Sequence, residues 1–223
     1  MKLIPLTVAL CAGAMFSASA VAAPTTISYD ITAVGSSLTD LSAPLAIRQF
    51  DAGLGHLIGI ELIYSSAVTS SVDLDNQSIH DANVPVSVDA TLSLYRPDNS
   101  LLATHTASLY NTSVGIVSGQ SIVNAASGNQ LLSIDALLGG AGDLALFTGA
   151  GYLSSVLSVQ AVSASSGPSG LSADFNTYAN GYGKVIYTFD AAPVPEPATC
   201  GMLLLGLGVV AYAAQRRAGA PRL

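Results

Sequence analysis

The fold class of this chain is decided by the stretch Val84-Pro-Val-Ser-Val-Asp-Ala-Thr-Leu-Ser-Leu-Tyr95. Apolar side chains stand at every second position from Val84 to Leu94, and polar residues fill most positions between them. Successive side chains of a β-strand point to opposite faces, so a period of two places one face on a core and the other in solvent. The stretch therefore predicts a long, half-buried β-strand.

Strand and turn signals continue on both sides of this stretch. Residues 96–100, Arg-Pro-Asp-Asn-Ser, predict a turn by their own chemistry. In residues 57–64 we expect Ile58, Ile60, Leu62 and Tyr64 on one face. Residues 38–44 predict a loop, and residues 131–138 allow a short helix as an alternative to a strand. Further strands are expected at 27–32, 45–50, 68–74, 101–110, 131–134, 144–147, 152–162 and 184–189.

Many short strands separated by turn signals predict an all-β fold, an antiparallel β-sandwich of the jelly-roll or Ig-like type. We expect this sandwich at residues 24–190, flanked by an N-terminal signal peptide and a C-terminal transmembrane helix. Residues 191–197 would form a linker, 198–214 the helix and 215–223 a basic cytoplasmic tail.

The body between the two ends is acidic and contains no cysteine. Removing Lys2, Arg216, Arg217, Arg222 and Glu196 from the totals of seven basic and 14 acidic residues leaves three basic and 13 acidic residues. Nucleic acids and anionic lipids bind basic surfaces, so we expect neither as a partner of the body. Because both cysteines lie in the ends, the body can form neither a disulfide nor a thiolate zinc site.

Residues 1–23 have the order of a secretory signal peptide. Lys2 is the basic start, residues 3–16 are apolar, and residues 17–23 are small. Cleavage is expected after Ala20, Ala22 or Ala23. The alternative, a membrane helix, is disfavoured because the small residues end the apolar run early.

The C-terminal 30 residues contain a rigid polar motif, an apolar span and a basic end. Pro195 and Pro197 fix their own φ angles, and they push Val194 and Glu196 toward extended conformations. Residues 198–214 carry no charge, which suits a short membrane-spanning helix. Basic residues after a span stay in the cytoplasm, so the body would lie outside. A plain membrane anchor behind a proline-rich linker is one interpretation.

The order of these features also resembles the PEP-CTERM sorting domain of exported proteins from many Gram-negative bacteria. The matching residues are the motif Val194, Pro195, Glu196 and Pro197, the apolar helix, and the membrane stop Arg216 and Arg217. The resemblance implies an exosortase-type processing enzyme as a partner. It also implies cleavage near the motif, followed by release or re-attachment at the surface.

The body resembles the choice-of-anchor E domain over roughly residues 26–190. The matching features are Gln49-Phe50-Asp51 with Leu54-Gly55, the run Phe147-Thr-Gly-Ala-Gly151 before a long strand, and Tyr187 near the end. Members of this family carry various C-terminal anchors, a PEP-CTERM tail among them. The resemblance brings no enzymatic activity.

Few residues of the body suggest chemistry. Asp73, Asp75, Asn76 and Asp81 cluster around a turn and supply hard oxygen ligands suited to calcium. The glycine and the final glutamate of an EF-hand are missing, so solvated turn residues are the alternative and we expect no cofactor. Glu61 is the body's single glutamate, and nothing marks a second acid as its partner in glycoside hydrolysis.

Tyrosines and histidines leave one further alternative open. His56, His80 and His105 show no metal-ligand spacing. Seven tyrosines could form a sugar-binding face or belong to the sandwich core: Tyr64, Tyr95, Tyr110, Tyr152, Tyr178, Tyr182 and Tyr187.

The sequence therefore predicts a surface or matrix protein that is not an enzyme. Its expected role is structural or adhesive within exopolysaccharide or a biofilm. The alternative is a lectin-like module that binds carbohydrate or calcium, and a secreted hydrolase is less favoured.

Overall fold

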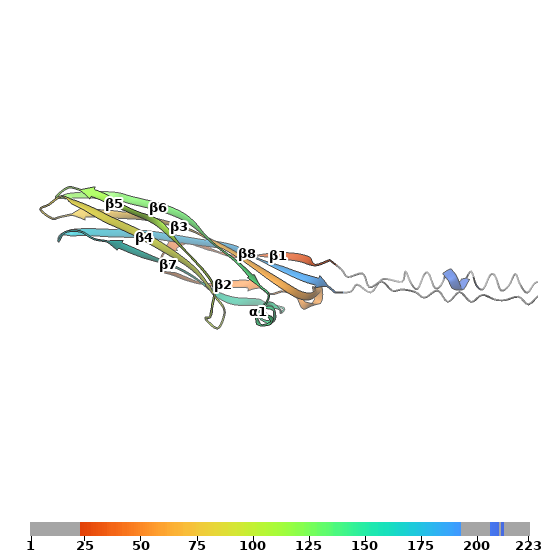
Figure 1. The fold of residues 1–223 in the computed structure, drawn as a ribbon. Helices are drawn as coiled ribbons and strands as arrows, with labels where there is room; N and C mark the ends of the chain where they lie inside the picture. Colours follow the sequence, from red (N-terminus) through yellow and green to blue (C-terminus); the bar gives the residue numbers. More distant parts are fainter. Residues whose placement is uncertain (1–22, 193–205, 210, 212–223) are drawn as a thin grey trace, which may run out of the picture.

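The structure, a computed structural model, describes residues 23–192, 206–209 and 211 (Figure 1). Eight β-strands, one 3₁₀ turn and one short α-helix form the body. In chain order they are β1 (Thr25–Leu38), β2 (Leu41–Arg48), η1 (Ala52–Leu54), β3 (Gly55–Asn76), β4 (Ala82–Tyr95), β5 (Leu101–Ile116), β6 (Gln120–Leu138), α1 (Ala141–Phe147), β7 (Tyr152–Ser165) and β8 (Leu171–Ala191). Residues 206–209 and 211 are helical.

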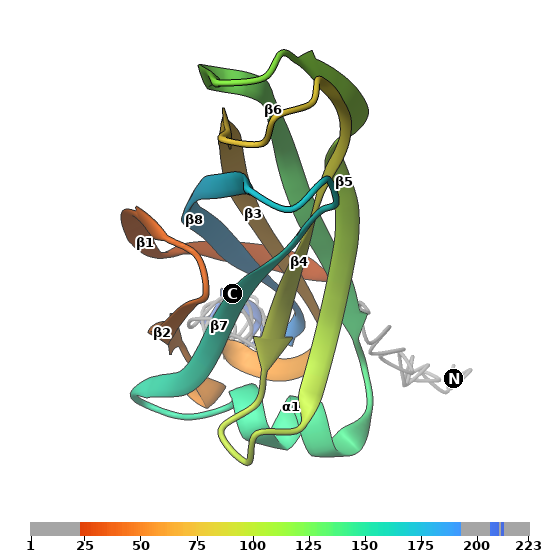
Figure 2. The same ribbon diagram turned by 90° about the vertical axis from the view of Figure 1, so that its left-hand side faces the viewer.

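The strands form two four-stranded antiparallel sheets that pack face to face (Figure 2). Sheet A has the order β1-β8-β3-β6, and sheet B has the order β2-β7-β4-β5. Strand β4 pairs with β5, β3 with β6, β2 with β7 and β1 with β8. This is the pairing of one long hairpin rolled onto itself, so of the two predicted sandwich types the structure has the jelly roll.

The strand that decided the fold class lies in the middle of sheet B and faces the core as predicted. All six alternating apolar residues from Val84 to Leu94 are buried in β4. The inner face of β3 opposes it with a row of buried residues that reaches from Leu57 to Asn76. Sandwich cores are built from such inward-facing rows on two sheets.

The apolar core has two parts, separated by a small group of hydroxyls. Val68 belongs to the larger part and Val72 to the smaller one. Between them Ser70 points inward, and its hydroxyl lies 2.8 Å from that of Thr177 and 3.4 Å from that of Tyr110. These hydroxyls satisfy one another, which lets polar groups stay inside the sandwich.

Two buried tyrosines differ in how their hydroxyls are satisfied. The ring of Tyr64 lies across Gly181 and Gly183 of β8, where a Cβ would collide with it. Its hydroxyl is buried and has no hydrogen-bond partner among the described residues, and burial raises its pKa to about 12. The hydroxyl of Tyr187 instead donates a 2.6 Å hydrogen bond to the carbonyl of Arg48.

Both ends of the body lie at one end of the sandwich, which we call the proximal pole. Thr25 at the start of β1 pairs with Phe189 near the end of β8, and Ala191 pairs with Gly55. Helix α1 lies at the same pole (Figure 1). The opposite distal pole is formed by the connections 77–81, 117–119 and 166–170.

Three sequence expectations about local structure were wrong. Residues 41–44 of the predicted loop belong to β2, an edge strand where the missing N–H of Pro44 is tolerated. A register shift between Leu57 and Gly59 turns Ile58 outward, away from the face it was expected to share. Residues 144–147 lie in α1 instead of a strand, and the first turn of α1 carries Asp143, which pairs with Arg96 at 2.9 Å.

The helix alternative for residues 131–138 was also wrong, because they pair with β3 as part of β6.

Other expectations concern residues that lie outside the described ranges. The predicted signal peptide (1–23, apart from Ala23), the motif 194–197 and the stop residues Arg216 and Arg217 lie outside the described residues. So does most of the predicted transmembrane helix 198–214. Within the described ranges, no helix has the length and apolarity needed to cross a membrane.

Candidate functional site

Two motifs that lie almost 100 residues apart in the sequence meet at the proximal pole. The backbone N–H of Phe50 donates to the carbonyl of Phe147 at 2.8 Å, and the N–H of Gly149 donates to the carbonyl of Phe50 at 2.9 Å. The side-chain amide of Gln49 donates to the carbonyl of Leu146 at 3.0 Å. A Cβ on Gly149 would lie 2.6 Å from the Gln49 side-chain oxygen, so a larger residue at this position would displace the Gln49 amide.

Aromatic residues of β8 pack against this junction. The ring centroid of Phe50 lies 5.7 Å from that of Tyr187 and 5.0 Å from that of Phe189. The guanidinium of Arg48 lies 4.4 Å from the ring centroid of Tyr29, within cation–π range. Burial, with a smaller contribution from Tyr29, raises the pKa of Tyr187. The junction therefore packs against the last strand of the body near its C-terminal end.

The four calcium candidates do not share one surface: three lie on the two faces of β3, and Asp81 lies in the connection 77–81. Asp73 and Asp75 are on the outer face of sheet A, whereas Asn76 is fully buried on the inner face. The Asn76 amide nitrogen donates to the carbonyls of His80 at 2.9 Å and Val117 at 3.2 Å. An amide held in this way ties two turns of the distal pole together.

The three acids of this set have separate partners. Asp73 accepts from the N–H of Asn124 at 2.7 Å, and Asp81 accepts from the N–H of Ser118 at 2.8 Å. Hydrogen bonds from Ser121 and then Gln77 lower the pKa of Asp75. Across the described part of the chain, no three His, Cys, Asp or Glu side chains gather as a metal site would require. The calcium site stays a prediction.

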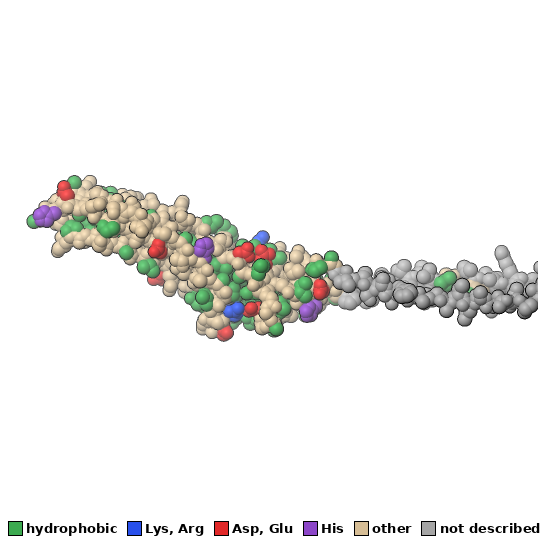
Figure 3. Space-filling model, in the orientation of Figure 1, with side chains coloured by type: hydrophobic (Ala, Val, Ile, Leu, Met, Phe, Trp, Pro, Cys, Tyr) green, Lys and Arg blue, Asp and Glu red, His purple; other side chains and the backbone are tan. Residues whose placement is uncertain are grey.

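The histidines and Glu61 are dispersed over the molecule. His56 of β3 stands opposite Asp190 of β8 in the strand register at the proximal pole, and His80 lies in a connection of the distal pole. His105 lies on β5, where its Nδ1 is 2.6 Å from the carbonyl oxygen of Ser133. Glu61 pairs with apolar residues on both sides, Leu137 and Ile186. Figure 3 shows histidine side chains far from one another along one face.

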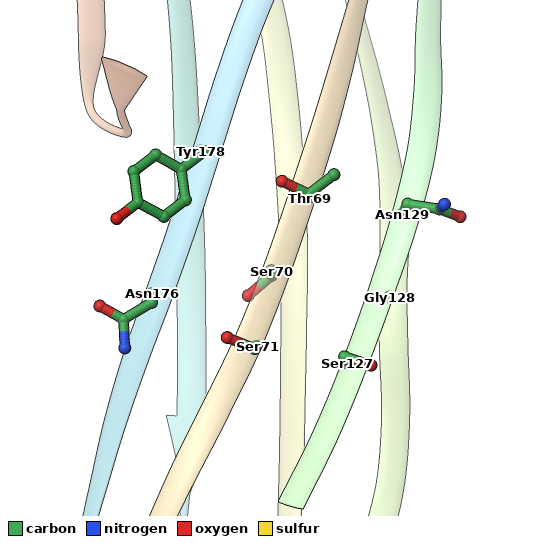
Figure 4. A pocket seen from close by; sticks show the side chains of 8 residues that line it. All are labelled: Thr69, Ser70, Ser71, Ser127, Gly128, Asn129, Asn176 and Tyr178. Carbon is green, nitrogen blue, oxygen red and sulfur yellow. The ribbon is translucent and has the colours of Figure 1, made fainter. Parts of the chain in front are cut away.

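The outer face of sheet A carries a polar groove that the sequence did not single out. Its volume is about 430 Å³, and it lies across β8, β3 and β6 (Figure 4). Its lining has no charged residue. The lining residues are Thr69, Ser70, Ser71, Ser127, Gly128, Asn129, Asn176 and Tyr178.

The strand register assembles this groove from three separate segments. Thr69 stands opposite both Tyr178 and Asn129, and Ser71 stands opposite both Asn176 and Ser127. Of these residues only Tyr178 was named among the candidates from sequence. The other signal was the alternation of Ser and Thr with apolar residues in 68–74, which marked the outer face but not its neighbours.

At the proximal pole the body ends directly before the polar motif. The N–H of Ala192 donates to the carbonyl of Leu54 at 3.0 Å, next to the pairing of Gly55 with Ala191. Strand β8 ends at Ala191, and Ala192 is still hydrogen-bonded to the body. Pro195-Glu196-Pro197 begins three positions after Ala192 in the sequence.

Residues 193–217 match the PEP-CTERM protein-sorting motif. The match includes the segment from Val194 to Pro197 and extends to Arg216 and Arg217. A sorting motif of this kind indicates an exported protein that is recognised by an exosortase-type processing enzyme. It also indicates sorting at the membrane toward the cell surface. None of the curated proteins matches the chain.

Some solved structures resemble the body weakly. A structure of infectious bursal disease virus, Gx strain, is 12% identical with a TM-score of 0.27, over 78% of this chain and 33% of that chain. A VP2 subviral particle of the same virus is 13% identical with a TM-score of 0.22, over 83% and 49%. The present chain thus covers between a third and a half of those viral chains. TM-scores this low support no conclusion about the present protein.

Proposed function

We propose that this protein is a structural or adhesive component of the extracellular polysaccharide or biofilm, delivered there through its sorting tail. The match of residues 193–217 to the sorting motif carries the proposal, because it indicates export toward the surface. The all-β body, with its acidic and cysteine-free composition, suits a protein that works outside the cell.

In this proposal the tail is a substrate. The two prolines make the segment from Val194 to Pro197 rigid and extended, a form suited to a recognition cleft. Residues 198–214 would span the membrane, with Arg216 and Arg217 holding the cytoplasmic side. Residues 1–23 would direct the chain to export and be removed.

We also propose that the protein is not an enzyme and that its body is of the choice-of-anchor E type. The dispersed histidines and the apolar neighbours of Glu61 support the first point. For the second, support comes from the motif residues quoted for that family, because Gln49, Phe50, Phe147, Gly149 and Tyr187 meet at one junction.

Mass spectrometry of the mature C-terminus in the native host tests the processing step. We expect the wild type to end near the motif, and Glu196→Ala to keep its full tail to Leu223. Asp190→Ala is the matched control, because Asp190 is an exposed acid shortly before the motif. A wild-type protein that still ends at Leu223 would reduce the tail to a plain membrane anchor.

Fractionation of the host culture tests the adhesive role. We expect the mature protein to remain with washed extracellular polysaccharide, and to appear in the soluble fraction after that polysaccharide has been digested. Protein that stays with the cells after digestion would contradict a role within the polysaccharide.

A further inference from the structure

We propose that the polar groove on the outer face of sheet A binds a neutral polysaccharide. The inference rests on the proposed function, since it assigns a site and a ligand class to the adhesive role. Four observations carry it: the exposed ring of Tyr178, the free polar side chains beside it, the absence of charge in the lining, and the continuation of the groove along the sheet.

Tyr178 supplies a surface for stacking. Its side chain is 44% exposed although it lies on a strand that runs through the middle of the sheet. Figure 4, which looks onto the outer face, shows its ring nearly face-on beside Asn176. An aromatic ring with an apolar face and a polar tip suits a ligand that is apolar on one side and hydroxylated at its edge, as a sugar ring is.

The polar groups next to the ring are available to a ligand. Among the described residues, no hydrogen bond engages the side chains of Thr69, Ser71 or Asn176, whereas Ser70 and Thr177 just behind them bond to each other. Hydroxyl and amide groups both donate and accept hydrogen bonds, which matches the hydroxyls of a sugar. The bonded pair behind the groove holds its floor in place.

Charge selects neutral over acidic polymers. The lining contains no charged side chain, and the nearest acids on the same face are Asp73 and Asp174, which stand opposite each other in the register. The body as a whole has 13 acidic and three basic residues. A polyanion would be repelled by this surface, whereas an uncharged chain would not.

The groove continues along the strands, as a polymer requires. A second hollow of about 410 Å³ adjoins it and shares Thr69 and Asn129 with it. Further along the same face of β8, Tyr182 is 53% exposed. A polysaccharide lying along the strands would therefore meet a second aromatic side chain after leaving the first.

Affinity electrophoresis of the mature protein isolated from its host tests the proposal. The probes are the neutral and acidic fractions of the host's own exopolysaccharide, separated by anion exchange. We expect the neutral fraction to retard the wild type and the acidic fraction not to. Tyr178→Ala should weaken binding about tenfold or more, as truncation of a central aromatic contact does. Tyr178→Phe, which keeps the ring, should stay within about threefold of wild type.

Tyr152→Ala is the matched control, because Tyr152 is 70% exposed but lies on sheet B. If circular dichroism shows that Tyr178→Ala is unfolded, Asn176→Ala takes its place, with a loss of at least about threefold expected. Equal binding by the groove variant and the control would overturn the proposal, as would a wild type retarded only by the acidic fraction or by neither.

These outcomes are separable from those of the proposed function. A protein that stays in the polysaccharide while the groove variant binds normally refutes the groove and keeps the role. A protein that binds through Tyr178 but is absent from the polysaccharide refutes the role and keeps the site.

Discussion

The same substitution should have different effects at two buried tyrosines of this core. Tyr187→Phe removes a hydroxyl that donates to the carbonyl of Arg48 at 2.6 Å and leaves that carbonyl without this donor. Loss of such a bond together with an unsatisfied partner costs about 1–3 kcal/mol. Tyr64→Phe removes a buried hydroxyl that has no partner among the described residues. It relieves a desolvation penalty of about 1–3 kcal/mol, part of which is offset by weaker van der Waals packing where the oxygen is missing.

We therefore expect Tyr64→Phe to lie between no change and about 1 kcal/mol of added stability. For a domain of this size each kcal/mol moves the melting temperature by about 2–4 °C, so Tyr187→Phe should melt roughly 2–12 °C below the wild type. Thermal melting and urea denaturation of the mature protein, followed by circular dichroism, measure both. If Tyr64→Phe loses as much stability as Tyr187→Phe, the Tyr64 hydroxyl has a hydrogen-bond partner and the reasoning fails.

Three further predictions concern the same body. Burial raises the pKa of Tyr64 from 10.0 to about 12, so this phenol ionises in the unfolded chain at a lower pH than in the folded one, and the wild type loses stability as the pH rises from 10 to about 12. The urea midpoint should therefore fall less between about pH 9 and about pH 11 in Tyr64→Phe than in the wild type. Asn76→Ala should lower the free energy of unfolding by about 2–4 kcal/mol, because it frees the turns of the distal pole. A chelator should leave the wild-type melting temperature unchanged, and a melting temperature that rises with added calcium would instead restore the metal site. Gly183→Ala would place a Cβ 2.6 Å from the carbonyl oxygen of Ile63 and should lower the free energy of unfolding, measured by urea denaturation, by about 1–3 kcal/mol. Gly35→Ala, with open space around its Cβ, should leave that free energy unchanged. Equal losses of stability in the two variants would contradict this reasoning.

The period-two stretches predicted the strands that bury one face, and they could not predict strands of another kind. The segment from Gln120 to Asn129 in β6 is rich in Ser, Asn, Ala and Gly, and none of its residues is fully buried. It is a strand because it lies at the edge of sheet A and pairs with the long β3. Pairing with a distant partner is a tertiary effect that a local pattern does not contain. The same holds for β2, whose first residues resemble a loop but pair with β7.

The candidate sites also differ in whether a local sequence pattern is enough to find them. The sorting motif is contiguous, so its residues could be found from order and spacing alone. The polar groove is made from three strands whose residues are about 50–110 positions apart in the chain, and only the register brings Thr69, Asn129 and Tyr178 together. The junction at Gln49 and Gly149 is intermediate: sequence likeness pointed to both motifs, but only the structure shows that they bond to each other.

The position of β8 has a consequence for when this protein folds. It is the last strand of the body, yet it is inserted between β1 and β3, so sheet A cannot close until residues 171–191 are available. Such non-local pairing is slow because distant segments must first meet. A chain synthesised and exported from its N-terminus would therefore cross the membrane before its sandwich is complete. Completion of the sandwich would then coincide with the arrival of the tail at the membrane or follow it.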